Sequence, residues 1–176
     1  MINTARHVKS KIRNIPDFPK KGILFKDITT ALKDPQTLAL IVDWFADSLR
    51  DKKIDYVVGL EARGFFFAPL IAYKLGAGFV PVRKPGKLPA AVEKVSYDLE
   101  YGKDSLEIHT DAIERGARVA IIDDVLATGG TAAAAQKLVA KVGGKLIATA
   151  FLLELPSLGG RSKLDKKSEI LSLIIY

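Results

Sequence analysis

The apolar residues of this chain recur with the spacings that distinguish helices from strands. From Leu38 to Leu49, apolar residues return every three or four positions, which predicts an amphipathic helix. The helix is preceded by Asp34-Pro35, and this pair is typical of an N-cap followed by the first helical position. We therefore expect a helix that begins at Pro35 and ends before the polar segment 51–53.

Two further stretches alternate between strand and helix patterns. The short β-rich run 56–60 is followed by an apolar segment, 65–75, that is long enough for a helix, and then by a second run at 79–82. The apolar run 119–122 precedes an Ala-rich helix pattern at 131–142, and another strand is expected from near Lys145. The alternation predicts an α/β fold with a central, mainly parallel sheet flanked by helices.

Parallel sheets of this kind bind ligands beyond the carboxyl ends of their strands. The segments expected there are 61–63, 83–87 and 123–131. A partly alternating, polar stretch at 96–108 predicts a hairpin that projects from the sheet.

Composition adds limits to this picture. The chain has 176 residues, 48% of them hydrophobic, which fits one globular domain. The net charge of +7 favours anionic partners, and nucleic acid, acidic membranes and phosphorylated metabolites all satisfy it. Basic residues never form a run longer than two, which argues against a nucleic-acid-binding tail.

Several classes of protein are excluded or disfavoured by what the sequence lacks. It contains no cysteine, so disulfide scaffolds and thiolate metal sites are ruled out. We find no signal peptide and no apolar stretch of membrane-spanning length, so a cytoplasmic protein is expected. His7 and His109 are not spaced as metal ligands, and no metal site made of dedicated protein ligands is expected.

The sharpest chemical signal is the segment 119–131, where a predicted strand runs into a Gly-rich turn and a helix. Gly129 and Gly130 allow a tight turn and close approach of a ligand, and the helix N-terminus favours an anion. Thr128 and Thr131 add hydroxyl donors. No Lys follows the glycines, so this is not the nucleotide-binding P-loop, and we expect a monophosphate held mainly by neutral donors.

Asp123 and Asp124 directly precede this turn, and two carboxylates would repel a phosphate at contact distance. They are better suited to accept hydrogen bonds from sugar hydroxyls or to hold a cation nearby. A ribose 5-phosphate satisfies both halves of the motif. The alternative is a solvated turn in which one Asp caps the helix.

The segment 119–131 resembles the phosphoribosyl diphosphate signature of type I phosphoribosyltransferases. Over nearly its full length, the chain is similar to the branch of that family that acts on adenine. The similarity is carried, in the same order as in the family, by segments 15–28, 59–65, 83–89, 97–102 and 154–158. It implies one phosphoribosyltransferase domain over residues 1–176, with an N-terminal hood at about 1–33 and a flexible flap hairpin at about 90–110.

The resemblance also implies an activity and partners. The reaction is transfer of the 5-phosphoribosyl group from 5-phosphoribosyl 1-diphosphate to adenine, which yields AMP and pyrophosphate. Mg²⁺ is the implied cofactor and is held through the substrate. A homodimer is implied, with the region of Arg63 near its interface, and neither nucleic acid nor a membrane is an expected partner.

Site residues carried over from the family fall into four groups. Those for the sugar and its phosphate are Asp123, Asp124, Ala127, Thr128, Gly129, Gly130 and Thr131. Those for pyrophosphate are Glu61, Ala62, Arg63, Arg83, Lys84, Lys87 and Tyr101, with a strained or cis peptide in 61–63. Those for adenine are Leu24, Phe25, Lys26 and Leu155, and Lys26 stands where the family commonly has Arg. Those for catalysis are Glu100, Asp123, Asp124 and Arg63, with Glu100 as the group that exchanges a proton with the purine.

Two rival functions fit part of the same pattern. A phosphoribosyltransferase for hypoxanthine, guanine or xanthine would share the 119–131 signature, because that segment reports the sugar phosphate and not the base. A regulator that senses phosphoribosyl diphosphate while binding nucleic acid would need an additional DNA-binding region.

Overall fold

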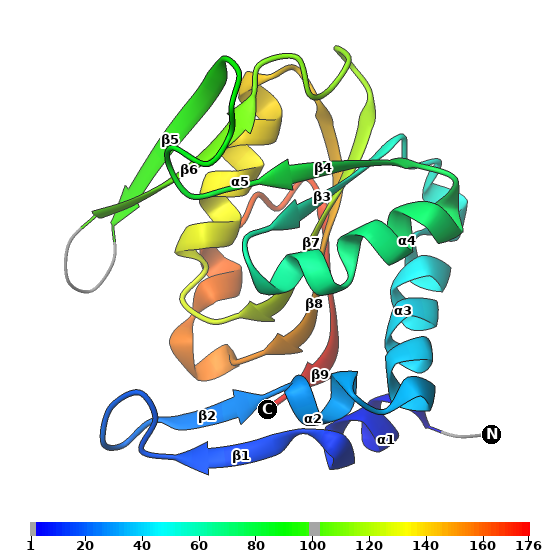
Figure 1. The fold of residues 1–176 in the computed structure, drawn as a ribbon, viewed down its shortest axis with the longest axis vertical. Helices are drawn as coiled ribbons and strands as arrows, with labels where there is room; N and C mark the ends of the chain where they lie inside the picture. The colour runs from blue at the N-terminus through cyan, green and yellow to red at the C-terminus, as the bar shows by residue number, and fades with distance from the viewer. Residues whose placement is uncertain (1–2, 99–102) are drawn as a thin grey trace. The chain divides into compact units, whose positions relative to one another are not determined.

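The computed structural model describes residues 3–98 and 103–176 and divides the chain into two compact units, Met1–Phe45 and Ala46–Tyr176 (Figure 1). Within the described residues, no helix combines the length and apolar character needed to cross a membrane. Each unit is described by itself below.

The first unit contains a two-stranded antiparallel hairpin and short helices. Its elements are α1 (Thr4–Lys11), β1 (Arg13–Pro16), β2 (Leu24–Asp27), α2 (Thr29–Leu32) and the first part of α3 (Pro35–Leu49). An ion pair of 2.6 Å between Arg13 and Asp27 joins the two strands. The Asp34 carboxylate accepts a hydrogen bond from the Thr37 N–H at 3.1 Å, so the predicted N-cap of α3 is confirmed.

The second unit is built on a five-stranded sheet with the order β4-β3-β7-β8-β9. The strands are β3 (Tyr56–Leu60), β4 (Gly78–Val82), β7 (Arg118–Leu126), β8 (Lys145–Glu154) and β9 (Glu169–Ile175). All four neighbouring pairs are parallel, which confirms the expected sheet.

Helices cover both faces of this sheet, as expected for buried parallel strands (Figure 1). On one face, residues at every second position of β3, β4 and β7 pack with α5 (Gly130–Lys141) in one buried cluster that includes Val58, Ile121 and Leu138. On the other face, α4 (Ala68–Leu75) lies so close to β3 that a Cβ on Gly59 would stand 2.8 Å from the Ala68 Cβ.

The antiparallel hairpin formed by β5 (Val92–Asp98) and β6 (Lys103–His109) confirms the hairpin predicted at 96–108, although it begins four residues earlier. Reciprocal backbone hydrogen bonds between Arg83 and Glu107 attach β6 to the segment that follows β4. The remaining short helices are η1 (Arg50–Lys52), η2 (Arg63–Phe66), η3 (Pro156–Leu158) and η4 (Gly160–Lys163).

Two predicted boundaries were wrong. The helix expected over 65–75 begins only at Ala68, after η2, because Pro69 lacks a backbone N–H and is accommodated in the first turn of a helix. Strand β7 continues to Leu126 instead of ending at 122, since Asp123 pairs with Phe151 and Leu126 with Glu154 of β8. Both acidic residues therefore belong to a strand, where Asp is intrinsically disfavoured.

Candidate active site

The carboxyl ends of β3 and β7 and the segment after β4 surround a cavity of about 350 Å³, within the size range of small-molecule sites. Its lining residues are Glu61, Ala62, Arg63, Lys84, Asp123, Asp124, Val125, Leu126, Ala127, Thr128, Gly129, Gly130, Thr131 and Ala132. All of them belong to the second unit.

One wall of the cavity is the N-terminus of α5. Gly129 is the N-cap residue with φ +79° and has no side chain with which to cap the helix, and the first turn contains no acidic residue. Gly130, Thr131 and Ala132 line the cavity, and the first N–H groups of a helix have no partner within it. The wall is thus suited to bind a phosphate group through N–H donors and the helix dipole.

The turn at 127–131, which leads into α5, packs against a turn that comes much later in the chain. A Cβ on Gly129 would lie 2.4 Å from the Gly160 carbonyl oxygen, and a Cβ on Gly160 would lie 2.2 Å from the Ala127 carbonyl oxygen. The next residue, Arg161, binds the Glu154 carboxylate through its Nε at 2.8 Å. Gly160 therefore helps to shape the loop, and no local pattern in the sequence indicated this.

The second wall carries the two acidic residues. Asp123 accepts a hydrogen bond from the Asp124 N–H at 2.9 Å, and Asp124 forms an ion pair of 2.7 Å with the Arg63 Nε. Burial raises the pKa of Asp123 well above its usual value, and the charge of Asp124 raises it further. Burial also raises the pKa of Asp124, although the Arg63 guanidinium opposes the shift.

Arg63 can lie close to β7 because the residue after it is a glycine. A Cβ on Gly64 would lie only 2.7 Å from the Ile122 carbonyl oxygen, so η2 packs against β7 more closely than a larger residue would allow. The Glu61–Ala62 peptide, at the start of the same segment, is cis, which confirms the expected unusual peptide.

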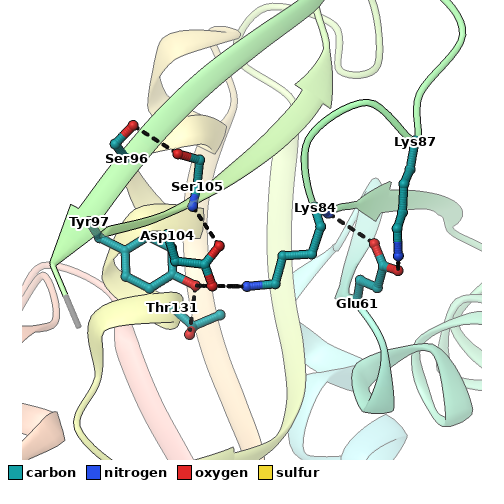
Figure 2. Close-up of polar contacts among 8 residues, drawn as sticks. All are labelled: Glu61, Lys84, Lys87, Ser96, Tyr97, Asp104, Ser105 and Thr131. Atoms are coloured by element: carbon teal, nitrogen blue, oxygen red, sulfur yellow. Dashed lines mark hydrogen bonds and ion pairs between the residues drawn. The ribbon is translucent and has the colours of Figure 1, made fainter. Parts of the chain in front are cut away.

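The third wall contains the carboxylate of Glu61, which binds neighbouring basic residues; Figure 2 shows its contacts with Lys84 and Lys87. Glu61 is bound by the Lys84 N–H at 2.9 Å, by the Arg83 Nη2 at 3.4 Å and by the Lys87 ammonium. Burial alone would raise the pKa of Glu61, but the hydrogen bonds from Lys87, Lys84 and Arg83 outweigh it and lower the pKa to about 2. Lys84 binds this carboxylate only through its backbone, whereas the Lys87 ammonium and the Arg83 guanidinium place two positive charges against the one negative charge of Glu61.

The structure thus brings together most of the residues expected for the sugar phosphate and for pyrophosphate. Arg83 and Lys87 approach the cavity through their contacts with Glu61. The residues proposed for the base belong to different units: Leu24, Phe25 and Lys26 lie in β2 of the first unit, and Leu155 follows β8 in the second. Glu100 and Tyr101 lie outside the described residues.

Among the described residues, no group of three or more His, Asp and Glu side chains could hold a metal ion by itself. The oxygen donors of Asp123 and Asp124 nevertheless suit Mg²⁺, which prefers oxygen ligands and keeps several of its waters. The acidic wall therefore fits a magnesium ion that is held mainly by its substrate.

A helix N-terminus, two adjacent acids and several basic residues meet around one cavity, and this combination is suited to a sugar that carries phosphate groups. In agreement, residues 29–173 match the family model described as the phosphoribosyl transferase domain.

Individual relatives narrow this class. The adenine phosphoribosyltransferase of Clostridium perfringens (strain SM101 / Type A) is 60% identical over 169 residues, which cover 96% of this chain and 98% of that protein. The crystal structure of adenine phosphoribosyltransferase from Thermoanaerobacter pseudethanolicus is 53% identical with a TM-score of 0.94, covering 98% and 99% of the two chains. The chain belongs to the adenine phosphoribosyltransferase family.

The Saccharomyces cerevisiae adenine phosphoribosyltransferase is also closely similar. Its crystal structure is 44% identical with a TM-score of 0.94, again over 98% of this chain and 99% of that one. That protein was crystallised with adenine and the sugar bisphosphate analogue D-2,5-dideoxy-2,5-imino-altritol 1,6-bisphosphate.

Proposed function

We propose that this protein transfers the 5-phosphoribosyl group of 5-phosphoribosyl 1-diphosphate to adenine, releasing pyrophosphate and forming AMP. One observation carries the proposal: a single cavity joins the N-terminus of α5 to the adjacent acids Asp123 and Asp124 and to the basic residues around Glu61. These three walls match the three parts of the donor substrate, which are its 5-phosphate, its ribose and its diphosphate.

In the proposed complex, the 5-phosphate binds residues 127–131 at the start of α5. The ribose hydroxyls donate hydrogen bonds to Asp123 and Asp124. Positive charge develops on the ring as the C1–O bond breaks, and the two carboxylates stabilise that charge. The raised pKa values of both acids support this role, because shifted carboxyl groups in a cavity are typical of functional sites and a nearby positive charge would favour their ionised forms.

The leaving diphosphate is proposed to bind the segment 61–63 with Arg63, Arg83, Lys84 and Lys87. Negative charge grows on it in the transition state, and nearby cations lower the energy of that state. When bound, Mg²⁺ would neutralise diphosphate oxygens, with Asp123 and Asp124 available to its waters.

For the base, we propose that Phe25 stacks on adenine, with Leu155 covering its other face, and that the backbone at Leu24 and Lys26 reads its edge. The adenine bound to the similar yeast protein supports this choice of base. The Lys26 ammonium donates to Asn14 at 2.8 Å. The side chain that stands where the family commonly has Arg therefore has a partner on the neighbouring strand β1. Glu100 and Tyr101 of the flap complete the proposed site, with Glu100 exchanging the purine proton.

The choice of base can be tested directly. We expect the protein, supplied with magnesium and phosphoribosyl diphosphate, to release pyrophosphate with adenine at least about a hundredfold faster than with hypoxanthine or guanine. A site whose polar groups match the edge of adenine would leave them unpaired with either of the other bases, and such bases are strongly rejected. Coupled pyrophosphate detection with each base in turn measures this ranking. Faster release with hypoxanthine or guanine would assign the protein to the rival base class, and a shift of random DNA or RNA on a gel at physiological salt would favour the regulator.

We also propose a homodimer, and an exposed apolar stripe on η2 and α4 supports it. Phe66, Leu70 and Tyr73 follow helical spacing and are 46%, 43% and 87% exposed in the single chain. Such a stripe typically marks a protein interface. Its first residue, Phe66, is the last residue of η2, and Arg63 is the first residue of the same short helix.

A charge in this stripe should separate the subunits. We expect the wild-type chain to elute with about twice its mass of 19.1 kDa, and Leu70→Glu to elute as a monomer, because a buried unpaired charge costs several kcal/mol. Light scattering coupled to gel filtration provides the measurement. Ile175→Glu is the matched control, since Ile175 is 59% exposed on β9, at the opposite edge of the sheet. A dimeric Leu70→Glu variant would contradict this interface.

Finally, we propose that the protein works in the cytoplasm. Phosphoribosyl diphosphate carries several negative charges and cannot cross a lipid bilayer unaided. An enzyme that consumes it must share the compartment in which it is made.

A further inference from the structure

A second polar network connects the β5–β6 hairpin to two residues of the cavity (Figure 2). Asp104 and Tyr97 are cross-strand partners, and the Tyr97 hydroxyl donates to the Asp104 carboxylate at 3.1 Å. The Lys84 ammonium binds the same carboxylate and also donates to the Tyr97 hydroxyl at 3.3 Å. Thr131, at the start of α5, donates to that hydroxyl at 3.3 Å.

The hydrogen bonds of this network leave one N–H donor of the Lys84 ammonium for a ligand. The Tyr97 oxygen accepts from Lys84 and Thr131 and donates its one hydrogen to Asp104, so its capacity is full. An ammonium has three N–H donors, and the network uses two of those of Lys84. The third can serve a ligand in the cavity without loss of either existing bond.

The network fixes a side chain that would otherwise be variable. A lysine ammonium stands on a four-carbon chain with many rotamers, and ordering that chain opposes ligand binding. Figure 2 shows that the Lys84 side chain extends toward the hairpin, while its backbone N–H is bound to Glu61. Lys84 is therefore held at its backbone by one carboxylate and at its ammonium by another, Asp104.

The Asp104 carboxylate, which binds the Lys84 ammonium, is itself held in place. The Ser105 N–H donates to its second oxygen at 2.7 Å, and its side chain is only 26% exposed. Farther along β6, Glu107 accepts a hydrogen bond from the Gly86 N–H at 3.0 Å. The hairpin thus holds the 83–87 segment through its backbone at Glu107 and through the Lys84 side chain at Asp104.

We propose that Asp104, supported by Tyr97, is a positioning residue that orders the Lys84 ammonium toward the diphosphate of the donor substrate. The inference rests on the proposed function, since it places the diphosphate at the wall formed by Glu61 and Lys84. Asp104 acts only through Lys84 and does not touch the substrate. Its effect therefore belongs to binding of the donor and not to binding of adenine.

The first test separates the Michaelis constants of the two substrates. Asp104→Ala is expected to raise the KM for phosphoribosyl diphosphate roughly tenfold, as expected for loss of a charge-assisted hydrogen bond that orders the binding group. The KM for adenine and kcat should stay within about twofold. Asp104→Asn keeps an acceptor oxygen and should recover part of the loss. Ser96→Ala is the matched control, because the Ser96 hydroxyl lies on the same hairpin and contacts Ser105.

A double-mutant cycle supplies the decisive comparison. Lys84→Ala should raise the same KM by at least as much, and adding Asp104→Ala to it should change the constant no further. If Lys84→Ala leaves the KM for the donor unchanged, the proposed diphosphate site is wrong. If Lys84→Ala raises it while Asp104→Ala leaves it unchanged or lowers it, or if the two effects multiply, the positioning role of Asp104 is wrong and the site stands.

Discussion

The Asp123→Asn variant is expected to lose about a hundredfold to a thousandfold in kcat while keeping its melting temperature or gaining in it. Asparagine keeps an oxygen that can accept the Asp124 N–H, but it removes the negative charge proposed to stabilise the ribose ring in the transition state. Single-turnover measurements with saturating substrates and thermal unfolding of the same samples check the two halves of the prediction.

The expected effect on stability follows from the raised pKa of Asp123. Burial and the Asp124 charge give this carboxyl a higher pKa when the protein is folded than when it is unfolded. Such a group favours the folded state only at acidic pH, and this contribution is lost as the pH rises through the folded-state pKa. At neutral pH the ionised form is therefore destabilising, and a neutral asparagine relieves that cost.

The control for this variant is a carboxylate on the surface, away from the cavity. Asp47→Asn breaks an exposed pair with Arg50 and should leave kcat unchanged, because exposed pairs contribute little and the residue lies on α3. An unchanged kcat in Asp123→Asn would remove this residue from the proposed chemistry. A parallel fall in melting temperature would show that the carboxylate is structural.

The Gly129→Ala variant is expected to lose both stability and substrate binding. The Cβ added at position 129 would lie 2.4 Å from the Gly160 carbonyl oxygen. Residue 129 also has φ +79°, which is strained for alanine. Strain and overpacking together should cost about 3–5 kcal/mol. For a chain of this length, such a cost lowers the melting temperature by roughly 6–20 °C. The KM for phosphoribosyl diphosphate should rise about a hundredfold or more, because the turn at 127–131 must move to relieve the clash.

Two other glycines separate the causes of this effect. Gly116 has φ +83° but open space around a Cβ, so Gly116→Ala should cost about 1–2 kcal/mol without changing either KM. A Cβ on Gly160 would meet Ala127 without a positive φ, so Gly160→Ala should raise the KM for the donor much as Gly129→Ala does. Normal donor binding in both Gly129→Ala and Gly160→Ala would contradict the proposed contact of the phosphate with this loop.

Much of the fold could be predicted from local patterns. The apolar runs at 56–60, 79–82 and 119–122 correspond to three neighbouring strands of the parallel sheet, because buried strands require such runs. The start of α3 was predictable from Asp34-Pro35, since an N-cap depends on residues within one turn. The end of β7 was not, because pairing with β8 outweighs the low strand propensity of two consecutive Asp residues.

The candidate site was predictable from the sequence to a similar extent. The turn at 127–131 and the basic segment at 83–87 were assigned to one binding region because parallel strands bring their carboxyl ends to the same edge. The close packing of Gly160 and the contact of Asp104 with Lys84 were not predictable. Each joins residues from separate elements whose mutual position no local pattern encodes.

By itself, the sequence determined the kind of chemistry available: a turn suited to bind phosphate, two adjacent acids and a set of cations, all expected at strand ends. It could do so because turn conformation, helix capping and strand burial depend on near neighbours. Only the tertiary structure decided which charges meet, pairing Arg63 with Asp124, two cations with Glu61, and Lys84 with Asp104. The physical reason is that these contacts depend on the distances between packed elements, which are set by the whole core.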